Sequence, residues 1–252
     1  MEMRFSDYIN NPMGKDNAVI SNREMYKQFY TNKYNALILR ENGSIEYHLY
    51  KYKEEYVCHM KIPSETVKKF YYDVVVYFYP KDKNVQSEKT LENYCVKFYS
   101  NDPAFVYTFA HAFSKNNLFM TDLAKKMSNQ ALKQKADQKN PKDEVGYVKS
   151  LYFAYLFMKN KGLFAKIRYV AAEKYSPRII QDKVMDASEK IKSRMEEEEK
   201  QKKKTKTANK GKQTDNQSGT NIGNAPLVRT TKRVSSIGKV GNVKSTRTTK
   251  RK

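Results

Sequence analysis

The stretch that decides the fold is Phe70-Tyr-Tyr-Asp-Val-Val-Val-Tyr-Phe-Tyr79, which Pro80 closes. Its even positions from Tyr72 to Phe78 are all apolar, and its odd positions mix aromatic with polar side chains. β-Branched and aromatic residues dominate it, which predicts a central strand covered on both faces. No side chain in it has an obvious chemical task, so the best-defined element of the chain indicates a scaffold rather than a reaction centre.

Other segments with a period of two lie on either side of this strand in the sequence. Asn42-Gly43 separates the first two of them, and this dipeptide supplies the positive φ that tight hairpin turns need. Short polar connections between consecutive strands favour antiparallel neighbours. The sequence therefore predicts an α+β fold whose five-stranded, mostly antiparallel sheet occupies about residues 34–100, most simply as a meander. The strands are expected at 35–40, 44–51, 55–62, 70–79 and 93–99.

Helical patterns follow the sheet. Asn101-Asp102-Pro103 combines a capping residue with a proline at the first helical position. The run 151–158 is apolar on nearly all sides, as expected of a helix that is buried among others. A helical half is therefore expected at about 103–203, with helices at 103–115, 121–135, 144–161, 163–174 and 177–203. One further short helix is expected before the sheet, at 23–30.

Both ends of the chain differ from this body. Residues 1–20 lack a clear period and contain the turn formers of 10–14, so they predict an N-terminal arm held by Phe5, Tyr8 and Ile9. Beyond residue 205 large apolar side chains almost disappear, and such a composition cannot offset the conformational entropy of folding. We expect one α+β domain over 21–203 and a disordered basic tail over 204–252.

The net charge of +22 is unevenly distributed. Residues 201–252 contain 15 Lys and Arg against one acidic residue, about +14, whereas residues 1–200 contain 34 basic and 26 acidic residues, +8. A flexible polycation binds a phosphate backbone by releasing counterions, without reading its sequence. A solubilising tail and an arm that docks on acidic protein surfaces are the alternatives. We favour contacts with a polyanion or an assembly, through Lys202, Lys203, Lys204, Lys210, Lys212, Arg229, Lys232, Arg233, Lys239, Lys244, Arg247, Lys250, Arg251 and Lys252.

No catalytic, cofactor or metal site is predicted. In the expected registers His48 and His59 point away from the core face of the sheet, and His111 lies on the wetter side of its helix. Cys58 and Cys95 fall inside expected strands, where cysteine usually packs as a small hydrophobe, and no ligands stand at metal spacing. Nucleotide loops and hydrolase motifs are absent from the sequence as well. These observations favour a protein that is not an enzyme and needs no cofactor.

The sequence also contains no membrane signal and no secretion signal. No apolar run approaches the length of a membrane-spanning helix, and the first residues lack an apolar signal segment. Two cysteines without a paired framework favour synthesis in a reducing compartment. No membrane association is therefore expected.

The aromatic content of the sheet offers a second candidate site. Lys61, Tyr77, Tyr79, Lys97 and Tyr99 share the less apolar face in the expected registers. Aromatic side chains interleaved with cations are how many sheets stack single-stranded nucleic acid. Ordinary packing beneath the helices is the competing interpretation, since no aromatic motif typical of RNA-binding sheets is present.

Several segments resemble a known group of proteins. These segments lie at residues 11–15 with 21–22, 70–74, 100–105 and 146–152. They are similar to segments of an uncharacterised virion-structural family of tailed bacteriophages that infect low-GC bacteria. The likeness covers roughly residues 1–195 and omits the basic tail. It implies a component of a capsid, neck or tail, made in the host cytoplasm and located in the virion, with other virion proteins or further copies of itself as partners.

Two functions follow as hypotheses. The first is a non-enzymatic bacteriophage structural or assembly protein whose basic tail contacts DNA or neighbouring acidic surfaces. The alternative is a non-sequence-specific nucleic-acid-binding protein in phage replication or packaging, in which the sheet face and the tail together hold a strand.

Overall fold

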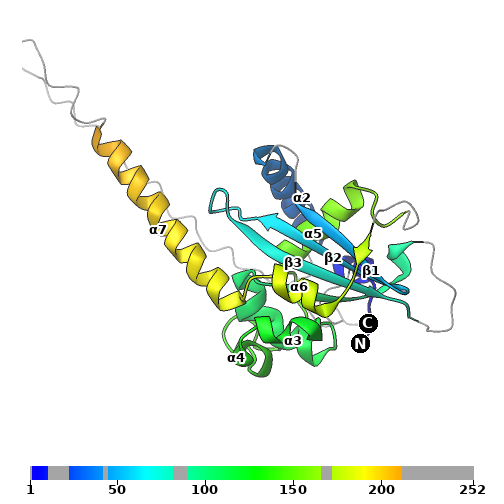
Figure 1. The fold of residues 1–252 in the computed structure, drawn as a ribbon. Coiled ribbons are helices and arrows are strands. Elements are labelled where there is room, and N and C mark those ends of the chain that lie inside the picture. The colour runs from blue at the N-terminus through cyan, green and yellow to red at the C-terminus, as the bar shows by residue number, and fades with distance from the viewer. Residues whose placement is uncertain (1, 11–22, 42–44, 82–89, 166–171, 212–252) are drawn as a thin grey trace, which may run out of the picture. The chain divides into compact units, whose positions relative to one another are not determined.

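The sheet confirms the α+β class. The structure is a computed structural model that describes residues 2–10, 23–41, 45–81, 90–165 and 172–211. Its strand order is β4-β3-β2-β1-β5, in which the first four strands form an antiparallel meander and β5 runs parallel to β1 (Figure 1). The strands are β1 (Tyr47–Tyr52), β2 (Glu55–Pro63), β3 (Tyr71–Tyr79), β4 (Cys95–Ser100) and β5 (Glu173–Lys174).

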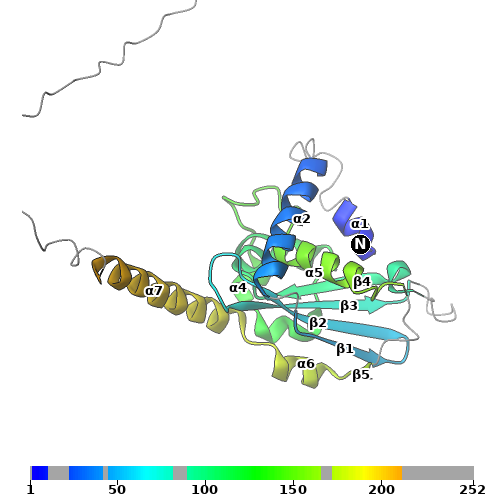
Figure 2. The same cartoon turned by 90° about the horizontal axis from the view of Figure 1, so that it is seen from above.

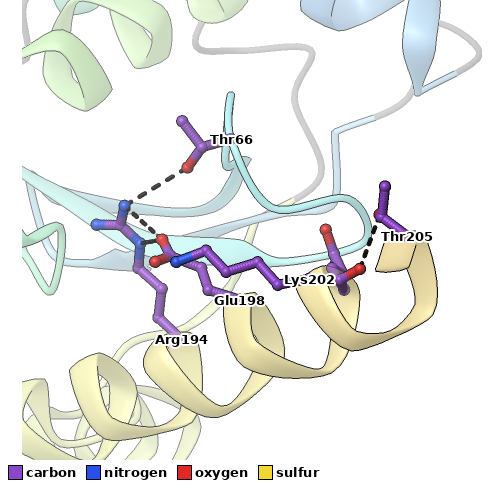
Figure 3. A pocket seen from close by; sticks show the side chains of 6 residues that line it. Thr66, Arg194, Glu198, Lys202 and Thr205 are labelled. Carbon is purple, nitrogen blue, oxygen red and sulfur yellow. Dashed lines mark hydrogen bonds and ion pairs between the residues drawn. The ribbon is translucent and has the colours of Figure 1, made fainter. Parts of the chain in front are cut away.

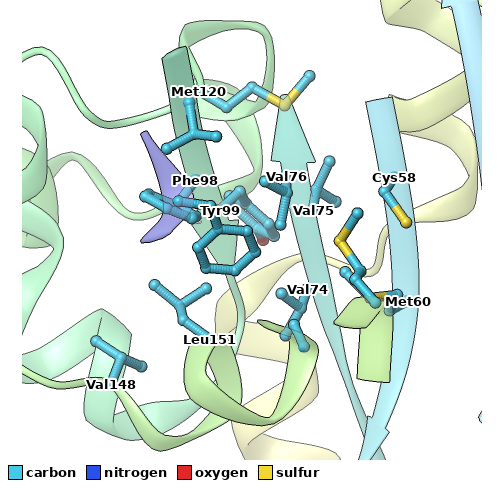
Figure 4. Packing of buried hydrophobic residues seen from close by; sticks show 14 of the residues in the cluster. Cys58, Met60, Val74, Val75, Val76, Phe98, Tyr99, Met120, Val148 and Leu151 are labelled. Atoms are coloured by element: carbon cyan, nitrogen blue, oxygen red, sulfur yellow. The ribbon is translucent and has the colours of Figure 1, made fainter. Parts of the chain in front are cut away.

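The decisive stretch forms β3, which is buried on both faces as predicted. Val74, Val76 and Phe78 point to one face and belong to the main hydrophobic core. Figure 4 shows Val74 and Val76 within it. Three helices cover this face, namely α1 (Phe5–Asn10), α2 (Arg23–Arg40) and α5 (Lys149–Asn160), while α6 (Pro177–Lys183) lies on the other side (Figure 2). Because the side chains of β3 alternate between two buried faces, the sheet lies between two layers of helices.

The first predicted strand, at 35–40, is wrong. These residues are the last turns of α2, which runs without a break from Arg23 to Arg40. Tyr34 and Leu37 are buried and Tyr30 packs against the core, so one helical stripe continues through the segment that looks strand-like. A short apolar run cannot be told from a buried helix by its period alone. The expected Asn42-Gly43 turn lies outside the described residues, and the first hairpin instead turns at Lys53, whose φ is +52°.

The N-terminal residues are more than an arm. Phe5, Tyr8 and Ile9 are buried as predicted, but they belong to the helix α1 rather than to an irregular segment. The chain before α1 pairs with β4, because Val96 N donates to Met3 O at 2.8 Å and Arg4 forms a bridge with Cys95. Residues 2–10 are thus part of the core, and the rest of the predicted arm lies outside the described residues.

The helical half is divided more finely than its pattern predicted. The predicted helix at 163–174 is wrong at its end, since 173–174 form β5, and the predicted continuous helix from 177 breaks at 184–186. There Asp186 accepts a hydrogen bond from Ser188 N at 3.0 Å and so caps the start of α7 (Ala187–Gly211). The remaining helical elements are a 3₁₀ turn (Leu91–Asn93), a π-helix (Phe105–Phe109), α3 (Ala110–Lys115), a 3₁₀ segment (Thr121–Lys126), α4 (Asn129–Lys133), α6 and α7 (Ala187–Gly211).

The end of the body also differs from the prediction. α7 continues to Gly211, beyond residue 203, where the sequence places the end of the domain. The chain divides into two compact units, Met1–Ala208 and Asn209–Lys252. Residues 212–252, for which a disordered tail is predicted, lie outside the described residues.

Gly146 lies in close contact with the ring of Phe109. A Cβ at this position would overlap Phe109 Cε1 and lie 2.9 Å from Cζ. We expect Gly146→Ala to lower the free energy of unfolding by about 1–3 kcal/mol, because the Phe109 ring must move. Urea unfolding measures the loss, and Phe109→Leu, which removes both ring atoms, should restore part of it in the double variant. Equal losses in the single and double variants would contradict the clash.

Candidate functional site

The less apolar face of the sheet is covered rather than open. Tyr99 is wholly buried, and its hydroxyl donates to Lys126 O at 3.3 Å. Lys61 pairs with Glu46 at 2.8 Å, which leaves Tyr77, Tyr79 and Lys97 as a partly exposed group at the far end. The prediction of a stacking platform that includes Tyr99 is therefore wrong, because α6 and the 3₁₀ segment Thr121–Lys126 pack on this face.

What remains of the predicted platform is a small cluster. The rings of Tyr77 and Tyr79 stack with centroids 5.7 Å apart, and Lys97 Nζ lies 5.8 Å from the Tyr79 ring. Burial, followed by a hydrogen bond to Glu55, raises the pKa of Tyr77 well above its ordinary value. The hydroxyl therefore stays protonated at neutral pH and serves as a hydrogen-bond donor within the fold.

A buried polar network lies in the middle of the same face. His59 Nε2 is 2.9 Å from Asp73 Oδ1, and Asn101 Nδ2 donates to Asp73 Oδ2 at 2.8 Å. Asn101 Nδ2 also donates to Met185 O at 3.3 Å, in the break between α6 and α7. The network thus ties β2, β3 and the end of β4 to the start of α7. Sequence reasoning placed His59 on this face but missed its partner, although a single aspartate inside an otherwise apolar, doubly covered strand requires one.

Lys190 extends this network into α7. Its Nζ lies 4.6 Å from the centroid of the Phe70 ring, at the end of the loop between β2 and β3. Burial lowers the pKa of Lys190, and the charge of Asp73 partly opposes that change. The first turns of α7 are therefore attached to the sheet by charge as well as by packing.

Asp73 makes the stability of the fold sensitive to acid. Burial raises the pKa of Asp73, but hydrogen bonds from His59 and Asn101 outweigh it and hold this pKa below the ordinary value of 3.8. A carboxyl with a lower pKa in the folded state stabilises the fold above its unfolded pKa and loses that contribution as the pH falls through its folded pKa. Below about pH 3.8 the free energy of unfolding of the wild type should fall as the pH falls. We expect this dependence on pH to be weaker in Asp73→Asn, and the urea midpoints of both proteins at several pH values measure it. Identical slopes would contradict this role.

His111 belongs to a separate cluster of titratable groups. His111 Nδ1 lies 2.7 Å from Asp143 Oδ1, and Lys115 Nζ lies 3.1 Å from Oδ2 of the same carboxylate. His111 is on the partly exposed side of its helix, as predicted. Cys58 and Cys95 are free and buried, and burial raises the pKa of Cys58 to about 12. Within the described residues, no group of three His, Cys, Asp or Glu side chains could hold a metal ion.

The predicted polyanion-binding residues begin on a folded element. Lys202, Lys203 and Lys204 are exposed on α7. Lys210 belongs to the last turn of the same helix. The ten others, from Lys212 to Lys252, lie outside the described residues. The basic segment therefore starts on a helix that the sheet domain anchors.

A groove lies between α7 and the loop that joins β2 to β3 (Figure 3). It has a volume of about 620 Å³ and is lined by Thr66, Arg194, Glu198, Gln201, Lys202 and Thr205. Arg194 Nη2 lies 2.8 Å from Glu198 Oε1 and 3.5 Å from Thr66 Oγ1. Gln201 Nε2 donates to Lys68 O at 3.2 Å. Of these lining residues only Lys202 was predicted from the sequence, since the loop is far from α7 in the chain.

Comparison with protein-family models, with curated proteins and with solved structures found no match. Among the helices in the described part of the chain, none is long and apolar enough to cross a bilayer. The candidate site therefore rests on the geometry of the chain itself.

Proposed function

We propose that this protein is a non-enzymatic structural or assembly component of a bacteriophage virion that attaches to DNA through its basic C-terminal part. The observation that carries the attachment is the anchoring of α7. Ile191 packs against the core, Lys190 lies over Phe70, and Gln201 donates to the loop between β2 and β3. The lysines that follow on α7 are therefore presented from a fixed base.

The proposed location in a virion follows from the resemblance of the segments at 70–74, 100–105 and 146–152 to phage structural proteins. In this account the sheet domain makes the contacts with other virion proteins or with further copies of the chain. The basic part holds packaged DNA or the acidic surface of a neighbouring subunit.

The alternative, a nucleic-acid-binding protein of phage replication or packaging, would use the same basic residues. It was expected to use the sheet face as well, and the burial of Tyr99 removes the centre of that surface. Binding through α7 and the residues after it is the part that both functions share, and it is the part that we test.

The test is binding of the full-length protein to duplexes of unrelated sequence at 50 and 200 mM salt. We expect similar affinities for all duplexes and a fall of about a thousandfold or more between the two salt concentrations, as for a protein that makes six to ten phosphate contacts. A strong preference for one sequence, or no binding at 50 mM salt, would contradict the proposal.

A further inference from the structure

We infer that the groove between α7 and the β2–β3 loop is a binding site for the phosphate backbone of duplex DNA. This inference rests on the proposed function and adds to it a fixed site on the folded body. The groove is defined by Thr66 of the loop and by Arg194, Gln201, Lys202 and Thr205 of α7.

The groove exists because α7 turns a polar stripe toward the loop. Arg194, Glu198, Gln201 and Thr205 follow one another at intervals of four, three and four residues, which places them on one side of the helix. An apolar stripe would have closed against the loop. The polar one leaves a space of about 620 Å³, equal to the share of roughly twenty water molecules in the liquid. That space is larger than a single bound ion needs, and it suits a segment of an extended ligand such as a DNA backbone.

The opposite wall is held in place. Arg40 Nη1 donates to Glu65 O at 3.2 Å, and Lys149 Nζ donates to Glu65 Oε2 at 2.6 Å. Contacts from α2 and α5 thus fix the loop from the side opposite α7. A ligand in the groove meets a preformed wall, which reduces the ordering cost of binding.

The donors in the groove suit phosphodiester oxygens. Arginine, lysine, threonine and glutamine side chains make most of the contacts that proteins form with the DNA backbone. Glu198 is the one acidic group in the lining, and Arg194 neutralises it at 2.8 Å. Lys202 is exposed at the groove, and Lys68 and Lys69 are exposed on the loop beside it. The balance of charge around the groove is positive.

The length of the lined surface suits DNA better than an isolated phosphate. Arg194 and Thr205 are eleven residues apart on α7, which corresponds to about 16 Å along the helix. One strand of a duplex presents a phosphate for about every 3.4 Å of axis, so this surface can follow roughly five phosphates. Lys203 and Lys204 follow Lys202 on the same helix.

The test compares two charge-matched triple variants of the full-length protein. Lys68→Gln, Lys69→Gln and Lys202→Gln remove the charges at the groove, while Lys125→Gln, Lys139→Gln and Lys142→Gln remove three exposed lysines elsewhere. At 0.1 M salt we expect the groove variant to bind duplex DNA about 10- to 100-fold more weakly. The slope of log affinity against log salt should become shallower by about two to three, since each phosphate that a lysine no longer neutralises reduces it by about 0.9. The control variant should change affinity less than about threefold.

A neutral variant separates the groove from general attraction. Thr66→Phe obstructs the groove without changing charge, and we expect it to weaken binding about tenfold, while Thr121→Phe on an exposed site leaves binding unchanged. Equal affinities of the groove and control triple variants, with wild-type binding intact, would overturn the groove but leave the proposed function standing. If the wild-type protein binds polyglutamate but not DNA, the ligand of the groove is an acidic protein surface and not DNA. If it binds neither, the proposed function itself is refuted.

Discussion

Replacing Phe5 by alanine is expected to lower the free energy of unfolding by about 3–5 kcal/mol. The reason is that Phe5 is only 1% exposed and its ring lies 5.0 Å from that of Phe98 and 5.3 Å from that of Tyr155. The same ring also contacts those of Tyr8, Phe78 and Phe164. Alanine would leave a cavity that these surrounding rings, held by the sheet and α5, cannot fill.

Chemical denaturation of the full-length variant measures this loss. Phe29→Ala is the matched control, because Phe29 is 51% exposed on α2, and we expect that change to cost less than about 1 kcal/mol. A loss below about 1 kcal/mol for Phe5→Ala would show that the N-terminal residues form the arm that the sequence predicts rather than part of the core.

Removing the carboxylate of Asp73 should be comparably damaging, at about 3–5 kcal/mol for Asp73→Ala, because it breaks a buried, hydrogen-bonded pair with His59. Asp73 is 4% exposed and His59 is 2% exposed. His59 Nδ1 already has no hydrogen-bond partner among the described residues, so the substitution leaves both ring nitrogens unpaired. It also removes the acceptor of Asn101 Nδ2 at 2.8 Å.

The matched control is Asp137→Ala, whose exposed carboxylate lies 3.5 Å from Lys135 Nζ. We expect it to change the free energy of unfolding by no more than about 1 kcal/mol. The double variant His59→Leu with Asp73→Leu should lose less than the sum of the two single changes, since it removes both members of the pair. Additive losses would mean that the two side chains act independently.

The sequence predicted the fold best where a hydrophobic period was compatible with only one type of secondary structure. The alternation through Val74, Val76 and Phe78 predicted a strand covered on both faces, and β3 is that strand. At 35–40 the short apolar run fitted both a strand and a helix, and only the stripe of Tyr30, Tyr34 and Leu37 against α5 decides for the helix. The two-residue strand β5 carries no periodic signal, so its pairing with β1 could not be predicted.

The candidate site shows the same limit. Charge alone identified Lys202 and the lysines after it, because a run of cations needs no fold to be visible. Thr66 and Arg194 carry no such signal, since they meet across 128 positions of the chain. Asp73 could have been found from its setting in an apolar strand, but its partners His59 and Asn101 come from neighbouring strands whose register the sequence left open.

The most direct test of the proposed attachment to DNA is the salt dependence of duplex binding by the wild type and by a full-length variant in which the ten Lys and Arg residues from 212 to 252 are replaced by Gln. If the basic C-terminal part holds DNA, the slope of log affinity against log salt becomes shallower by about 0.9 for each phosphate that the variant no longer neutralises. The residual slope then comes from α7 and from Lys68 and Lys69 of the loop beside it. An unchanged slope and affinity in the variant would contradict attachment through residues 212–252, because DNA binding would then rest on the folded body alone.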